Sequence, residues 1–243
     1  MEVERGRVKS GAVELHYLAA GQGEAVVLVH GLAGSAHWWQ LTLPALAARY
    51  RVYALDLAGF GGSRAGQPFE LRAAAHQIIT FLDALGIEKT SLVGHSMGGF
   101  IVADLAASHP ERVEKLVLVD AAALPFENGV LDRGLGLALA VWKIPPAFWP
   151  VFLVDAYRAG PRTLWRAATG LLTADIARDL SQIEAETLVV WGKHDHLVPL
   201  SLGIELARRL HHARLEIIPG AAHSPMLERP AHFNRLLLEF LQG

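Results

Sequence analysis

The chain has 243 residues, of which 52% are hydrophobic, and it carries 22 Lys and Arg against 24 Asp and Glu. Because these charges nearly balance and no long run of one sign occurs, the sequence has no electrostatic footprint for nucleic acid. The absence of cysteine excludes disulfides, thiolate metal sites and a cysteine nucleophile, and it is typical of the reducing cytoplasm. We therefore expect a cytoplasmic protein with one large, helix-covered core.

Neither a targeting segment nor a membrane span is expected. The first five residues, Met1 to Arg5, are acidic and mixed, whereas a signal peptide has a basic region followed by an apolar one. The least polar stretch, residues 134–157, contains Lys143 and three prolines, which prevent the unbroken helix that a bilayer span requires. We interpret this stretch as part of a helical insertion and expect no stable membrane insertion.

The order of the expected elements indicates a mostly parallel sheet. Two alternating segments with glycine turn signals open the chain and are typical of an antiparallel hairpin. Short apolar runs then alternate with helix-length segments, as in buried parallel strands joined by right-handed crossovers. The expected strands are 3–9, 13–18, 25–29, 52–55, 92–93 with its flanks, 116–119, 187–191 and 215–218. The expected helices are 38–49, 71–85, 97–108, 200–210 and 230–241.

The strand signal disappears after Asp120 and resumes only near residue 184, with helical and proline-broken sequence between. We therefore predict a core formed by residues 1–120 and 184–243 and a helical cap formed by residues 121–183. The cap is rich in aromatic residues, which either line a substrate pocket as a lid or simply attach the cap to the core. These aromatic residues are Phe126, Trp142, Phe148, Trp149, Phe152, Tyr157 and Trp165.

The segment 94–99, Gly-His-Ser-Met-Gly-Gly, follows an expected strand and precedes an expected helix. Such a segment predicts a sharp turn with the Ser96 hydroxyl at its apex, where Gly94 and Gly98 let strand and helix approach closely. The helix N-terminus favours negative charge on a reacting oxygen, so the Met97 N–H is a candidate oxyanion donor. The alternative interpretation is a glycine pattern that only closes a tight turn.

A second oxyanion donor is expected after an earlier strand. Residues 27–35, Val-Leu-Val-His-Gly-Leu-Ala-Gly-Ser, run from strand directly into a glycine-rich turn. The Leu32 N–H is the candidate donor, since two N–H groups aimed at the developing oxyanion are the usual arrangement in acyl transfer. A glycine loop that merely enters a helix would explain the glycines but not their place at the carboxyl edge of the sheet.

Two late loops supply a candidate acid and base. Asp195 follows the expected strand 187–191, and His223 follows the expected strand 215–218. Parallel strands bring their carboxyl ends to one edge, so both side chains can reach Ser96 despite their separation in the chain. Neutral His223 would take the proton from Ser96, while Asp195 fixes the histidine tautomer. Asp120 remains the alternative acid.

The other histidines favour no competing site. His109, His211, His212 and His232 lie at helix ends or on the last helix, where surface exposure is the simpler interpretation. His194 and His196 flank Asp195 and could suggest a metal, but no further ligand clusters with them in the sequence. We therefore expect neither a metal nor a cofactor.

Together these motifs resemble the α/β-hydrolase superfamily, in its branch of capped serine esterases, epoxide hydrolases and C–C hydrolases. The resemblance rests on His30-Gly31 with its loop, the segment 56–63, the segment 94–99, and Asp195 with His223. It implies an α/β-hydrolase fold, with about eight mostly parallel strands, helices on both faces and a helical cap after the sixth strand. Asp56 resembles the aspartate that supports a loop in this family. Ala33 and Ala58 stand where proline is often found.

The resemblance also implies a reaction. Epoxide hydrolases and haloalkane dehalogenases have aspartate where this chain has Ser96, so acyl transfer is favoured. We expect a carboxylic ester hydrolase that cleaves small to medium apolar esters through an acyl-Ser96 intermediate, as a monomer or small homo-oligomer. Lactones and C–C bonds are alternative substrates of the same triad, although C–C hydrolases usually have a longer glycine-rich oxyanion loop. A non-catalytic small-molecule receptor on this fold is a further alternative.

Overall fold

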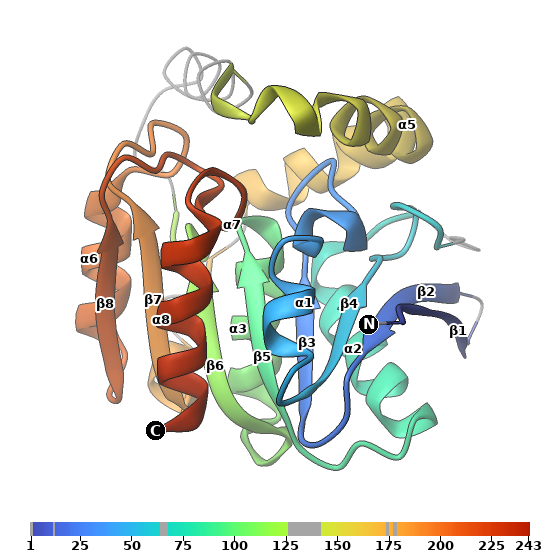
Figure 1. Cartoon of the computed structure of the whole chain (residues 1–243), viewed down its shortest axis with the longest axis horizontal. Coiled ribbons are helices and arrows are strands. Elements are labelled where there is room, and N and C mark those ends of the chain that lie inside the picture. The colour runs from blue at the N-terminus through green and yellow to red at the C-terminus, as the bar shows by residue number, and fades with distance from the viewer. Residues whose placement is uncertain (1, 12, 64–67, 126–141, 174, 177–178) are drawn as a thin grey trace.

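A computed structural model of the protein describes residues 2–11, 13–63, 68–125, 142–173, 175–176 and 179–243. Its sheet has eight strands in the order β1-β2-β4-β3-β5-β6-β7-β8 (Figure 1). The strands are β1 (Glu4–Ser10), β2 (Val13–Ala20), β3 (Ala25–Val29), β4 (Arg51–Leu55), β5 (Thr90–His95), β6 (Val113–Val119), β7 (Glu186–Gly192) and β8 (Ala213–Ile218). Strand β2 pairs antiparallel with β1 and β4, and all other pairs are parallel.

The register of the parallel strands aligns their carboxyl ends. Val29 of β3 lies opposite Gly94 of β5, and Val119 of β6 lies opposite both His95 and Val190 of its two neighbours. At the far side, β7 and β8 are still paired at their last residues. The loops that follow β3, β5, β6, β7 and β8 therefore start at one edge of the sheet.

The sheet changes its winding direction between β3 and β5. After β3 the chain moves outward to β4, then returns across the sheet to place β5 on the other side of β3. Helices that follow adjacent strands at such a point lie on opposite faces, which opens a crevice beyond the strand ends. The loop 30–35 and the turn at Ser96 both begin at this crevice.

Helices cover both faces of the sheet. One apolar core packs beneath α2 (Leu71–Ala84), α3 (Met97–Ser108) and α6 (Leu200–Arg209). The other packs beneath α1 (Leu43–Leu46), α7 (Pro225–Glu228) and α8 (Pro230–Gln242). The central strands β3, β5, β6 and β7 are buried on both sides, which explains their mostly apolar sequences. Short 3₁₀ helices are η1 (Ala36–Trp39), η2 (Pro110–Arg112), η3 (Pro146–Phe148) and η4 (Leu180–Gln182).

A long helix, α5 (Trp149–Leu172), lies between β6 and β7 in the chain and crosses above the carboxyl ends of the strands (Figure 1). It is interrupted at Gly160, whose φ of 70° and ψ of 162° lie outside the helical region, and Pro161 follows directly. This arrangement confirms the predicted α/β-hydrolase fold with a helical segment after the sixth strand. The exact division at residues 120 and 184 stays a prediction, and residues 126–141 of the predicted cap lie outside the described residues.

The expected helix 38–49 is wrong in detail. The structure has two short elements there, η1 and α1, separated by Gln40 to Thr42. Pro44 lies at the start of α1, and proline lacks the N–H needed in a helix interior, so it begins a new helix and cannot continue an earlier one. The other expected helices agree with the structure to within a residue at each end.

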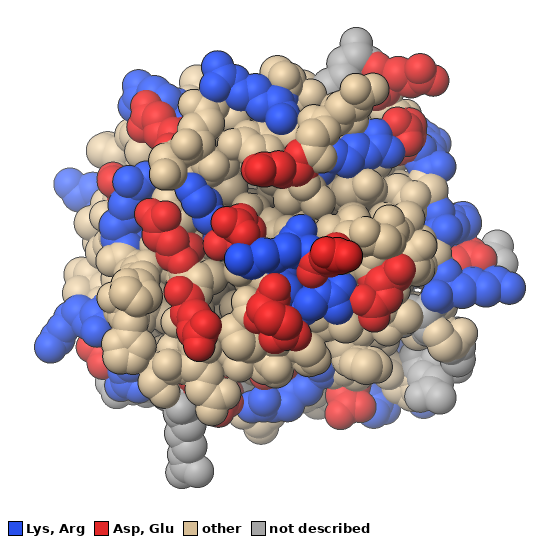
Figure 2. Space-filling view, turned by 90° about the horizontal axis from the view of Figure 1, so that it is seen from below, with Lys and Arg blue, Asp and Glu red and all other residues tan. Residues whose placement is uncertain are grey.

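The face opposite α5 carries charges of both signs. Figure 2 shows lysine and arginine interspersed with aspartate and glutamate there. Ion pairs at the amino ends of the strands join Lys89 to Glu114 at 2.8 Å and Arg112 to Asp83 at 2.8 Å. None of the helices in the described ranges combines the length and apolar character that a membrane crossing requires.

The close approach of α3 to β3 at Gly98 gives a stability prediction. A Cβ at Gly98 would lie 2.4 Å from the Val29 carbonyl oxygen and 2.6 Å from that of His30. Gly98→Ala should therefore lower the free energy of unfolding by about 1–3 kcal/mol, measured by denaturant titration.

Gly170→Ala is the matched control, because a Cβ at Gly170 of α5 would come no closer than 3.4 Å to Leu71 of α2. Replacing a helical glycine there should raise stability by roughly 0.5–1 kcal/mol. Equal effects at the two positions would contradict the steric account.

Candidate active site

Ser96 stands at a strained turn between β5 and α3. Its backbone has a φ of 53° and a ψ of −114°, in a region that residues with a side chain rarely adopt and that costs about 1–3 kcal/mol. The turn is held by a hydrogen bond from the Ser96 N–H to the Val119 carbonyl at 2.9 Å, and by one from the Ala122 N–H to the Ser96 carbonyl at 3.0 Å. The hydroxyl is thereby fixed at the carboxyl edge of the sheet.

The structure brings the three predicted side chains together. His223 Nε2 lies 3.0 Å from Ser96 Oγ, and His223 Nδ1 lies 2.8 Å from Asp195 Oδ2. Ser96 and His223 are each 7% exposed. The hydrogen bonds between the three side chains are therefore shielded from bulk water, although Ser96 and His223 keep a small accessible surface. If Nδ1 carries the proton, as its carboxylate partner requires, Nε2 is free to accept the proton of the Ser96 hydroxyl.

The loop after β7 aims Asp195 at the histidine. Its Oδ1 accepts hydrogen bonds from the Leu197 N–H at 2.8 Å and the Val198 N–H at 3.0 Å. These bonds leave Oδ2 for His223. Burial opposes ionisation of Asp195, but His223, Asp120 and the Val198 N–H hold the pKa of its carboxyl below the usual value. Asp195 is therefore a stable anion beside the imidazole.

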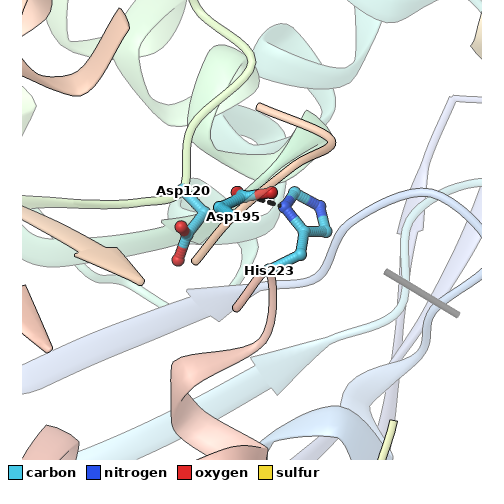
Figure 3. Close-up of side chains that lie close together, drawn as sticks. All are labelled: Asp120, Asp195 and His223. Carbon is cyan, nitrogen blue, oxygen red and sulfur yellow. Dashed lines mark hydrogen bonds and ion pairs between the residues drawn. The ribbon is translucent and has the colours of Figure 1, made fainter. Parts of the chain in front are cut away.

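Asp120, the alternative acid, lies behind Asp195 and does not bond the imidazole (Figure 3). Its Oδ1 accepts the Gly192 N–H at 3.0 Å, and its Oδ2 is buried without a hydrogen-bond donor among the described residues. Burial and the negative charge of Asp195 raise the pKa of Asp120 well above its usual value. A neutral Asp120 has an O–H that can point to Asp195, which satisfies both carboxyl groups.

Asp120, Asp195 and His223 also form a group whose potential ligand atoms lie within 4.8 Å of one another. However, His223 Nδ1 and Asp195 Oδ2 already share a hydrogen bond. The raised pKa of Asp120 and the lowered pKa of Asp195 fit a pair of acids that shares one proton. His194 and His196 point to no metal either, because both are exposed while Asp195 between them is buried.

Two residues that the sequence did not single out hold His223 in place. His95, next to Ser96, lies with Nε2 2.7 Å from the His223 carbonyl oxygen, and since a carbonyl only accepts, Nε2 carries the proton. Burial, with a smaller contribution from His223, lowers the pKa of His95 to about 3, so its ring is neutral. The Glu228 carboxylate accepts the N–H groups of Ala222 and Ser224 at 2.8 and 2.9 Å.

The candidate oxyanion loop lies against Ser96. A Cβ built on Gly31 would lie 3.0 Å from Ser96 Cβ, so only glycine lets the two segments approach this closely. Within the described residues, neither the Leu32 N–H nor the Met97 N–H donates a backbone hydrogen bond. Neither predicted donor is therefore occupied by a backbone acceptor of the described residues.

The same loop contains a strained residue. Gly34 N–H donates to the Gly31 carbonyl at 3.1 Å, closing a turn in which Ala33 has a φ of 58°. This left-handed conformation favours glycine, and proline, whose φ is fixed near −65°, could not adopt it. Proline, which the resemblance leads one to expect at position 33, is therefore incompatible with the backbone path of this chain. Asp56 accepts the Ala36 N–H at 2.6 Å just beyond the turn.

The cap aromatics divide into two groups. Phe148 and Phe152 contact Trp38 of η1, with ring centroids 5.5 and 6.4 Å apart, and these contacts attach the cap to the core. Trp149 belongs to the same group, because it packs edge-to-face against Phe152 with ring centroids 5.9 Å apart. Three other aromatics face solvent, with exposures of 71–88%: Trp142, Tyr157 and Trp165. Phe126 lies outside the described residues.

Comparisons with known proteins find similarity over nearly the whole chain. The model of the α/β hydrolase fold family matches residues 24–150. A putative carbamate hydrolase, RutD, from Caulobacter sp. (strain K31) is 32% identical over 265 residues, which cover 99% of both proteins. The 2-hydroxy-6-oxo-6-phenylhexa-2,4-dienoate hydrolase of Comamonas testosteroni is 31% identical, with 94% of this chain and 91% of that protein covered. The crystal structure of a membrane phospholipase A has a TM-score of 0.86 at 29% identity, covering 99% and 86% of the two chains.

The neutral, buried His95 gives a pH prediction. Its pKa is about 3 in the folded protein against 6.5 for an ordinary histidine, so below pH 6.5 the unfolded chain takes up a proton that the folded chain does not. This histidine's contribution to stability is complete above pH 6.5 and is lost as the pH falls, by about 1.4 kcal/mol per pH unit. His95→Asn should flatten the fall of unfolding free energy between pH 6.5 and 4.

The control is His211→Asn, which changes an exposed histidine and should leave the pH dependence as in the wild type. Identical slopes for His95→Asn and the wild type would show that His95 is not held neutral by burial.

Proposed function

This chain belongs to the α/β hydrolase fold family, and on that premise we propose that it is a serine hydrolase of small to medium, uncharged carboxylic esters. The observation that carries the proposal is the unbroken chain of hydrogen-bond distances from Ser96 Oγ through His223 to Asp195, 3.0 and 2.8 Å long. A serine hydroxyl is a weak nucleophile unless a base faces it and the base is itself oriented by a third group.

In the first half of the reaction, Ser96 Oγ attacks the ester carbonyl while His223 Nε2 takes the hydroxyl proton. The imidazolium is stabilised by the Asp195 carboxylate, and the negative oxygen is bound by the N–H groups of Leu32 and Met97. Collapse of the tetrahedral intermediate breaks the C–O bond, and His223 returns its proton to the leaving alkoxide. The alcohol leaves, and the acyl group remains on Ser96.

In the second half, water replaces the alcohol. His223 removes a proton from water as the water oxygen attacks the acyl carbonyl, and the second tetrahedral intermediate expels Ser96 Oγ, which regains a proton from His223. The products are a carboxylic acid and the free enzyme. No metal or cofactor takes part in these steps.

The charges around the site favour an uncharged substrate. The principal charges that act on Asp120, Asp195 and His95 come from carboxylates and histidines of the described residues. A further buried carboxylate, Asp155, bonds the end of the oxyanion loop. Of these groups, Asp195 has a lowered pKa and is an anion next to His223, and it would repel an anionic substrate in a site of low dielectric constant.

The relatives' names support a second candidate reaction. The relative from Comamonas testosteroni is named as a hydrolase of a 2-hydroxy-6-oxo dienoate, and RutD is named as a putative carbamate hydrolase. The same nucleophile, base and oxyanion donors could act on a vinylogous diketone, a lactone or a carbamate. We rank esters first because a dienoate carries a carboxylate, which the Asp195 anion next to His223 would repel.

A substrate panel tests the reaction and its class. The wild type should hydrolyse p-nitrophenyl acyl esters, and Ser96→Ala should lose nearly all of this activity because no other described side chain faces His223 Nε2. A fluorophosphonate probe should label the wild type at one serine and leave Ser96→Ala unlabelled.

Other outcomes would change the assignment. Labelling with turnover of a vinylogous diketone or a carbamate alone would keep the serine mechanism and reject the ester. A protein that is not labelled and does not turn over any of these substrates would favour a small-molecule receptor. Equal ester hydrolysis by wild type and Ser96→Ala would reject Ser96 as the nucleophile.

The assignment of the acid has its own test. Asp195→Asn should lower kcat by about ten-thousandfold, because an amide cannot hold the His223 tautomer with a free Nε2. Asp120→Asn should retain most activity, since an amide N–H can take the place of the carboxyl O–H that faces Asp195. The reverse order of effects, measured by kcat at neutral pH, would make Asp120 the acid.

A further inference from the structure

The cap supplies a buried carboxylate to the oxyanion loop of the core. Asp155 lies in the first half of α5 and is only 3% exposed. Its Oδ2 accepts a hydrogen bond from Ser35 Oγ at 2.7 Å, across 120 residues of chain. Burial raises the pKa of Asp155, and the bond from Ser35 opposes this shift. A buried carboxyl group is costly unless it is bonded, so this contact is an organised part of the cap interface.

Ser35 is the residue at which the oxyanion loop ends. It caps η1, where its Oγ accepts the His37 N–H at 3.2 Å. The next residue, Ala36, donates its N–H to Asp56 of the core at 2.6 Å. The end of the loop is thus held from two sides, by a core carboxylate at Ala36 and by a cap carboxylate at Ser35.

The loop needs such support because it is strained. Ala33 has a φ of 58°, and a residue with a side chain keeps this conformation only where its surroundings hold it. Leu32, the candidate oxyanion donor, directly precedes Ala33. A shift of the loop toward an unstrained path would move the Leu32 N–H relative to Ser96.

A second contact joins the cap to the same region. Trp38 of η1 stacks on His95 with ring centroids 5.8 Å apart, and its edge packs against Phe148 beneath the cap helix at 5.5 Å. The position of α5 is therefore linked to the oxyanion loop through Asp155 and to the Ser96 turn through Trp38.

We propose that Asp155 is a positioning residue that acts through Ser35 to hold the oxyanion loop with the Leu32 N–H directed at the Ser96 crevice. This inference rests on the proposed serine hydrolase function, because it assigns the loop a role in binding the oxyanion. The cap then contributes to transition-state stabilisation as well as to enclosing the substrate.

A double-mutant cycle tests the proposal. Asp155→Ala should lower kcat by at least about tenfold with little change in KM, because a displaced oxyanion donor weakens binding of the transition state more than of the substrate. Asp155→Asn, which keeps an acceptor oxygen, should restore most of this kcat. Ser35→Ala should lower kcat similarly, and the double variant should fall no further than either single one.

Rates are expressed per fluorophosphonate-labelled site, so a merely structural loss of folded protein does not lower them. Asp104→Ala is the matched control, because it removes a half-buried carboxylate on α3 whose pKa is also raised by burial. It should reduce stability without changing kcat. Additive effects of Asp155→Ala and Ser35→Ala, or an unchanged kcat in Asp155→Ala, would overturn the proposal.

Hydrogen exchange separates this inference from the proposed function. Asp155→Ala should increase amide exchange in residues 31–38, whatever substrate the protein acts on, and Asp104→Ala should not. Increased exchange in a protein with no hydrolase activity would reject the function but keep the cap-to-loop link. Unchanged exchange in an active enzyme would reject the link alone.

Discussion

The candidate active site depends on one constraint, the alignment of the carboxyl ends of the parallel strands. Because Val29 of β3 pairs with Gly94 of β5, and Val119 of β6 pairs with both His95 of β5 and Val190 of β7, the loops that follow these strands open onto one crevice. A serine, a carboxylate and a histidine from three such loops can then meet at hydrogen-bond distance. A slip of one residue in a strand would turn its side chains to the other face and move its loop by about 3.3 Å.

The titratable groups of the site lie close together but differ in protonation state. Asp195 is kept ionised by His223 and two backbone N–H groups, while burial next to this anion keeps Asp120 neutral. His95 is kept neutral by burial, and its ring N–H supports the His223 backbone. In the proposed reaction, the proton that His223 takes from Ser96 is held next to the Asp195 carboxylate, which stabilises the imidazolium.

The sequence predicts much of this arrangement because each participating loop has its own local signal. Ser96 lies among glycines whose positions predict a sharp turn. Asp195 and His223 each follow an apolar strand. The contacts that support them are not predictable in the same way. Asp155 reaches Ser35 across 120 residues, and no local pattern marks an aspartate on a cap helix as the partner of a particular serine. The exchange of β3 and β4 in the sheet order is likewise a property of long-range pairing.

The most direct test of the central claim is to trap the intermediate on the residue that is proposed to carry it. A slowly deacylating ester is mixed with the protein, quenched in acid within the first turnover, and the peptides are mapped by mass spectrometry. The account predicts an acyl group on the peptide that contains Ser96, absent from His223→Ala under the same conditions. Turnover with no acylated peptide, or with the acyl group on a different residue, would contradict it.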